Sequence, residues 1–141
     1  HAWNSPPEYQ LIKQDHIHHP YLIEYPKEII YQKIKYMTKL LENTFEIKMV
    51  SHRAGRWAFN EYYAKVLNEL GYKVDCSVTP GVSWKKHKGD PKGNGGTDYK
   101  NFPNDSYFLD LNDISQKGNS SLLEVPVTIL SRNITHPRIT K

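Results

Sequence analysis

The residues Ser51–Trp57, S-H-R-A-G-R-W, directly follow a short apolar run, Ile47–Val50, that predicts a strand. A second polar segment, Val74–Trp84 (V-D-C-S-V-T-P-G-V-S-W), overlaps the end of a second predicted strand, Tyr72–Val78. An amphipathic segment, Ala58–Leu70, joins the two strands. Because ligands bind at the carboxyl ends of parallel strands in α/β folds, polar residues after two successive strands predict a site at that edge.

Two amphipathic helices are predicted around the first strand. One runs from Tyr25 to about Asn43, because Pro26 suits a first helical position and apolar residues recur at spacings of three and four. The other covers 58–70 and ends at Gly71, a typical helix stop. The order helix, strand, helix, strand with short connections favours parallel β-α-β units.

The second half of the chain is poorer in periodic patterns. Residues 85–118 are rich in Gly, Pro and Asn and are predicted to form a long binding loop. The apolar run Leu122–Leu130 predicts a last strand, and Pro126 within it indicates an edge or a bulge. A pattern that begins at a strand end and stops after a strand predicts a single, partial α/β domain over 1–141.

Chain length and charge limit the classes of function that the sequence supports. The chain has 141 residues, about one domain, and 19 Lys and Arg against 15 Asp and Glu give a formal charge of +4. Nucleic-acid binding would need this charge clustered on one face, so a nucleic-acid partner is not predicted. The nearest cluster is Lys85, Lys86, His87, Lys88 and Lys92, which keeps a polyanion-binding domain open as an alternative.

Cysteine content and hydropathy exclude further classes of protein, namely disulfide-rich and membrane-spanning ones. The single cysteine, Cys76, excludes an internal disulfide framework and a Cys-rich metal site, and its place in a predicted strand favours a core role. The apolar runs are far shorter than the roughly 20 residues that cross a bilayer, so no membrane span is predicted. Ten Tyr and three Trp fit either a core or a groove for carbohydrate.

Three histidines in D-H-I-H-H-P, His16, His18 and His19, raise the question of a metal site. Asp15 adds an oxygen ligand, but nothing nearby completes a recognised ligand spacing. A structural or surface role is therefore the favoured interpretation.

Five blocks of sequence carry a resemblance to a known family. They are His1–Pro7 (H-A-W-N-S-P-P), Ser51–Trp57, Leu70–Gly81 (L-G-Y-K-V-D-C-S-V-T-P-G), Gly95–Tyr99 (G-G-T-D-Y) and Leu122–Ile129 (L-L-E-V-P-V-T-I). In this order they resemble the polysaccharide deacetylase family, the nodulation-deacetylase homology domain or carbohydrate esterase family four. The closest resemblance is to a bacterial branch with uncharacterised or cell-envelope roles.

The resemblance implies a fold and an activity. The fold would be part of a deformed (β/α) barrel with parallel strands, and the activity a metal-dependent removal of acetyl groups from an N-acetylated polysaccharide. In the family a divalent metal, often zinc, is held by one Asp and two His and keeps an open position for water and substrate. The implied partner of the chain is therefore carbohydrate.

The resemblance also implies roles for single residues. Arg53 would hold the catalytic Asp of the family in its ionised form, and Asp75 would anchor Arg53, because a guanidinium between two carboxylates lowers their pKa values and fixes their geometry. His1 would be a metal ligand. The implied substrate-binding residues are Trp3, Arg56, Trp57, Trp84, Asp98 and Tyr99.

Structural roles stay open for the same residues. Arg53 and Asp75 also fit a pair that ties two strand ends together, and His52 fits a supporting histidine. Arg56 and Trp57 also fit packing and a helix start.

Two blocks of the family are not found. Its Asp-Asp block would lie upstream of His1, and its Leu-x-His block has no match, since His136 lacks the preceding Leu. The expectation is that these 141 residues are an inactive part of a deacetylase. A carbohydrate-binding domain without catalysis, with Trp3, Trp57, Trp84 and Tyr99 forming an aromatic rim, is the alternative.

Overall fold

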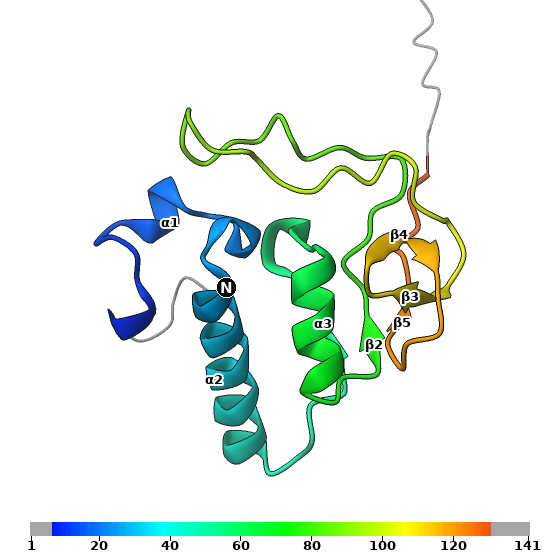
Figure 1. The fold of residues 1–141 in the computed structure, drawn as a ribbon, viewed down its shortest axis with the longest axis horizontal. Helices are drawn as coiled ribbons and strands as arrows, with labels where there is room; N and C mark the ends of the chain where they lie inside the picture. Colours follow the sequence, from blue (N-terminus) through cyan, green and yellow to red (C-terminus); the bar gives the residue numbers. More distant parts are fainter. Residues whose placement is uncertain (1–6, 131–141) are drawn as a thin grey trace, which may run out of the picture.

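The computed structural model describes residues 7–130, which form a mixed α/β fold (Figure 1). Two long helices, α2 (Lys27–Phe45) and α3 (Glu61–Glu69), lie side by side, and α3 lies between α2 and the sheet. The strands are β1 (Ser51–His52), β2 (Val74–Asp75), β3 (Tyr107–Asp110), β4 (Asp113–Lys117) and β5 (Leu123–Glu124). A short helix, α1 (Asp15–His18), and 3-10 turns at Pro7–Tyr9, Leu22–Glu24 and Gly55–Trp57 complete the described elements.

The five strands form one sheet in the order β1-β2-β5-β3-β4. β1, β2 and β5 are parallel, whereas β3 is antiparallel to both β5 and β4. The α/β class with parallel strands, predicted from the sequence, is confirmed. The predicted barrel is not seen, because the sheet formed by residues 7–130 stays open between its edge strands β1 and β4.

The two predicted helices are present, with shifted ends. α2 follows Pro26 and ends where Glu46 takes a left-handed conformation with φ of 54°. α3 begins at Glu61 rather than at Ala58, because the Asn60 side chain accepts a hydrogen bond from the Tyr63 backbone N–H at 2.9 Å and caps the helix there.

The parallel strands are shorter than predicted. The first is Ser51–His52, and the run 47–50 before it is not a strand. β5 stops at Glu124, although Val125 N–H still donates to Asp75 O at 2.8 Å. Pro126 has no N–H to continue the ladder, and this explains the early end.

The long loop predicted over 85–118 contains two strands in its second half. β3 and β4 form a hairpin there, and its buried face is Tyr107, Leu109 and Ile114. The side chain of Asp110 accepts the Asn112 N–H at 2.8 Å and so builds the turn.

The core lies between the helices and the sheet. Its fully buried apolar residues include Phe59, Leu67, Val78, Leu109 and Leu122. Within residues 7–130, no helix is long and apolar enough to span a bilayer.

Candidate functional site

The carboxyl ends of β1, β2 and β5 place three ionisable residues next to one another. His52 is in register with Asp75, and Asp75 is in register with Glu124. Asp75 and Glu124 are completely buried, and His52 is partly buried. Polar residues are therefore present at this edge of the sheet, as expected. The neighbours of Asp75 are His52 and Glu124, however, and not the expected Arg53.

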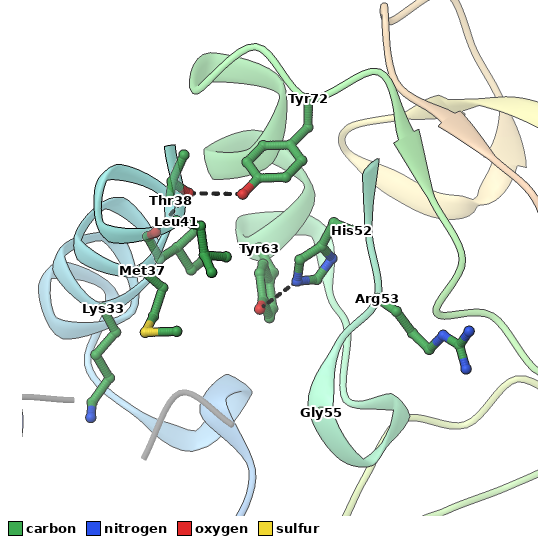
Figure 2. Close-up of a pocket in the computed structure, with 10 residues that line it drawn as sticks. Lys33, Met37, Thr38, Leu41, His52, Arg53, Gly55, Tyr63 and Tyr72 are labelled. Atoms are coloured by element: carbon green, nitrogen blue, oxygen red, sulfur yellow. Dashed lines mark hydrogen bonds between the residues drawn. The ribbon is translucent and has the colours of Figure 1, made fainter. Parts of the chain in front are cut away.

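Asp75 and His52 belong to a chain of hydrogen bonds. His52 Nδ1 lies 2.6 Å from Asp75 Oδ1, and His52 Nε2 lies 2.9 Å from the Tyr63 hydroxyl (Figure 2). Asp75 also accepts from the Ser77 hydroxyl at 3.0 Å and from the Ser77 backbone N–H at 2.9 Å. Because a carboxylate only accepts, His52 donates to Asp75 through Nδ1, and in the tautomer with this proton alone Nε2 accepts the hydrogen bond of the Tyr63 hydroxyl.

Tyr63 keeps its proton in this arrangement. Burial, and then the neighbouring charge of Asp75, raises the pKa of the Tyr63 hydroxyl far above its ordinary value of 10.0. The chain from Tyr63 through His52 to Asp75 is therefore fully satisfied, and His52 fits the interpretation as a supporting histidine.

The expected pair between Arg53 and Asp75 is not formed. The Asp75 carboxylate is occupied by His52 and Ser77 instead. Arg53 is exposed, and its guanidinium carbon lies 5.3 Å from the centroid of the Trp57 ring. Figure 2 shows the Arg53 side chain directed away from His52. Arg53 and Trp57 are thus the predicted residues that the structure brings into direct contact at the rim.

The turn that carries Arg56 and Trp57 is strained. Both residues have positive φ angles, 54° and 56°. Non-glycine residues in this region cost on the order of 1–3 kcal/mol each and cluster at functional sites. Arg56 lies over the Tyr21 ring with its guanidinium carbon 5.8 Å from the centroid.

Tyr99 supports this turn from the side of the core. Its hydroxyl donates to the Trp57 carbonyl, and the side chain is completely buried. Tyr99 is therefore a core residue that holds Trp57 in place, and its contact with substrate stays a prediction. Asp98 is partly exposed and lies 3.9 Å from Lys85 Nζ, so it contributes to a pair between neighbouring loop segments.

Trp84 is joined to the same turn through the backbone. Its indole N–H donates to the Thr79 hydroxyl at 2.9 Å, and its backbone N–H donates to the Thr97 carbonyl. The Thr97 hydroxyl in turn bonds both the N–H and the carbonyl of Phe59, at 3.0 and 2.7 Å. The loops after β1 and β2 are thereby fixed against each other, and the half-buried Trp57 and Trp84 belong to this joined surface.

A pocket of about 250 Å³ opens between α2, α3 and β1. Figure 2 shows Tyr63 and His52 on one side of it and the α2 side chains on the other. Its lining residues are Lys33, Ile34, Met37, Thr38, Leu41, His52, Arg53, Gly55, Tyr63 and Tyr72. The Tyr72 and Thr38 hydroxyls bond each other at 2.9 Å. Neither Tyr63 nor Tyr72 was predicted as a site residue; the signal that could have indicated them is that a buried Tyr hydroxyl requires a partner.

The histidine-rich segment does not form a metal site. The two Asp15 carboxylate oxygens accept the backbone N–H groups of Leu11 and Ile12 at 2.8 and 2.9 Å, and His18 Nδ1 pairs with Asp90 Oδ2 at 3.0 Å. Among residues 7–130, no group of three His, Cys, Asp or Glu is placed to hold a metal ion. The predicted ligand His1, the predicted rim residue Trp3 and His136 lie outside the described residues.

Comparison with known proteins finds a likeness in fold. The chain is similar to a crystal structure of a provisionally assigned polysaccharide deacetylase from Mycobacterium smegmatis, with a TM-score of 0.50 and 20% sequence identity. The match covers 76% of this chain and 28% of that chain, so the chain spans less than a third of the length of the protein it matches. No model of a protein family matches the sequence, and no curated protein matches it.

Proposed function

We propose that this chain is part of a carbohydrate deacetylase, a hydrolase that removes acetyl groups from an N-acetylated polysaccharide. The observation that carries the proposal is the likeness in fold to the crystal structure of a provisionally assigned polysaccharide deacetylase. The five sequence blocks quoted above resemble the same family. Backbone shape and residue pattern are different properties of the chain, and both favour the same class of enzyme.

In this proposal the joined loops after β1 and β2 bind the sugar chain. Trp57 and Trp84 are half-buried, and aromatic rings of this kind present flat apolar faces to sugar rings. Arg53 lies over Trp57 with its charge exposed, so its planar donors are free to reach a substrate oxygen. Asp75 is buried and acts on this surface only through its hydrogen bonds to His52 and Ser77.

A divalent metal, zinc in the family that the chain resembles, would polarise the amide carbonyl and activate water. The described residues do not fit such an ion, because no three ligands converge within residues 7–130. Zinc binding through His1 is therefore a proposal that concerns residues outside the described ones. Binding and positioning of substrate are the roles proposed for the described residues.

Release of acetate from an N-acetylated chito-oligosaccharide by the full-length protein tests this function. Arg53→Ala is expected to lower kcat/KM by roughly 10- to 100-fold, the loss expected for a charge-assisted hydrogen bond to substrate. Arg53→Lys keeps the charge but not the planar fork and should recover only part of the loss.

Lys48→Ala is the matched control, because Lys48 is an exposed cation before β1, whereas Arg53 follows its carboxyl end. This variant should hydrolyse as fast as the wild type. Equal activity of Arg53→Ala and the wild type would show that Arg53 is not part of the binding surface. A full-length protein that releases no acetate would contradict the deacetylase proposal itself.

The half-buried rings of Trp57 and Trp84 also favour a second candidate, glycan binding without hydrolysis. In that case the oligosaccharide binds the full-length protein, Trp57→Ala weakens binding, and no acetate forms. Isothermal titration with the same oligosaccharide distinguishes the two functions.

A further inference from the structure

Two carboxyl groups lie side by side in the core, at the ends of β2 and β5. Asp75 and Glu124 are register partners on parallel strands, and both side chains are completely buried. Two ionised carboxylates in this position would each lose their hydration and would also repel each other. One of the two must therefore carry a proton.

The hydrogen bonds identify which one carries it. Asp75 accepts three, one from His52 and two from Ser77. Glu124 accepts one through Oε1, from the Val78 N–H at 3.0 Å, and its buried Oε2 receives none from the described residues. Donors stabilise the ionised form of a carboxyl group, so Asp75 is the carboxylate and Glu124 is the acid.

The pKa of Glu124 agrees with this assignment. Burial, followed by the neighbouring charge of Asp75 and a hydrogen bond with it, raises the pKa of Glu124 from 4.5 to about 10. The ionisable groups around the pair are His52 and Arg53 at the end of β1, Tyr63 on α3, Cys76 after β2, Tyr99 in the loop and Tyr107 on β3. Burial raises the pKa values of Tyr63, Cys76, Tyr99 and Tyr107, so these groups add no charge at neutral pH.

We propose that Glu124 is a neutral carboxylic acid in the folded protein, that it donates its proton to Asp75, and that it is thereby a positioning residue for His52 and Tyr63. The resulting chain of hydrogen bonds runs from β5 through β2 and β1 to α3 and ends at the Tyr63 hydroxyl, which lines the pocket. The inference goes beyond the proposed function, since it requires neither acetate release nor metal.

Protons released on unfolding provide the test. Urea unfolding of the full-length wild type at pH 7 should release about one more proton than unfolding of Glu124→Gln, because the unfolded Glu is ionised and the folded one is not. The Gln side chain keeps an acceptor for Val78 and supplies an N–H to Asp75, so the variant should fold. Glu46→Gln is the control, since Glu46 is exposed, and it should release as many protons as the wild type.

Equal release by the wild type and Glu124→Gln would overturn the proposal. Should the variant fail to fold, the infrared carbonyl stretch of a protonated carboxyl group in the native wild type decides the question. The band is expected at pH 7 and should disappear as the pH rises through about 10, the pKa of Glu124. Absence of the band at pH 7 would also overturn the proposal.

The positioning role has its own readout in the ring nitrogens of His52. Their NMR resonances should be retained in Glu124→Gln, which still donates to Asp75, and should shift in Glu124→Met, which does not. Resonances that stay at the wild-type positions in both variants would show that Glu124 does not act through Asp75 on His52.

Discussion

His52, Asp75 and Glu124 share one face of the sheet, because register partners on neighbouring parallel strands point to the same side. Arg53 is one residue beyond His52, and side chains alternate along extended backbone. Arg53 therefore lies on the side of Cys76, and its charge opposes the rise in the pKa of the Cys76 thiol. The same alternation explains why His52, and not Arg53, became the partner of Asp75.

At the residue scale, the partner of Asp75 could not be predicted because the register of β1 and β2 was not known. The sequence places His52, Arg53 and Asp75 near the ends of successive strands, so their gathering at one edge could be predicted. Which neighbour of Asp75 bonds it depends on the alignment of β1 with β2, and the sequence of neither strand specifies that alignment. The role of Tyr99 could not be predicted for a similar reason, because its burial depends on how the loops after β1 and β2 meet.

The buried acid gives the protein a pH-dependent stability. Glu124 has a pKa of 4.5 when exposed and about 10 when folded, so between these values the folded chain holds a proton that the unfolded chain has lost. The contribution of Glu124 to stability is complete below pH 4.5 and is lost as the pH rises through about 10. The free energy of unfolding should fall across this window by at most about 1.4 kcal/mol per pH unit.

Urea unfolding at several pH values measures this dependence. Glu124→Gln should give a flatter profile than the wild type, whereas Glu46→Gln should follow the wild type. Parallel profiles for Glu124→Gln and the wild type would contradict the prediction.

At the scale of elements, the sequence was most informative where a periodic pattern coincided with a start or stop signal. α2 has an apolar stripe and is preceded by Pro26. α3 ends at Glu69, close to the helix stop predicted at Gly71, which has a φ of 88°. The hairpin of β3 and β4 was missed, because the Gly, Asn and Asp content of its surroundings is typical of loops. Its alternation of buried Tyr107, exposed Phe108 and buried Leu109 is a strand signal that composition concealed.

The N-terminal cap of α3 is expected to contribute measurably to stability. Asn60 Oδ1 accepts from the Tyr63 backbone N–H, so Asn60→Ala leaves that donor without its partner and should cost about 1 kcal/mol. Asn60→Asp retains an acceptor and should stay near the wild type. The same Asn→Ala change at the exposed Asn43 inside α2 removes no cap and should not destabilise the chain. Urea midpoints of the variants decide the question, and equal losses at Asn60 and Asn43 would show that the cap contributes nothing.

At the scale of the whole molecule, the described residues form a surface whose loops are held in place by hydrogen bonds. They do not form a complete set of catalytic groups. The turn Gly55–Trp57, which follows Arg53, is held by Tyr99 from the core, and Thr97 of the neighbouring loop holds Phe59 just after it. The match to the mycobacterial crystal structure extends over 28% of that chain. The proposed deacetylase therefore needs groups beyond residues 7–130, above all for a metal ion.

Zinc content of the full-length protein tests where those groups lie. His18 is paired with Asp90, and Asp15 is bonded to backbone N–H groups, so His18→Ala should leave the zinc content unchanged. His1→Ala should lower it, since the family that the chain resembles places a metal ligand there. The reverse result, zinc lost in His18→Ala and kept in His1→Ala, would place the ion in the histidine-rich segment and would show that the role assigned to His1 is wrong. Zinc retained in both variants would assign the metal to other residues of the full-length protein.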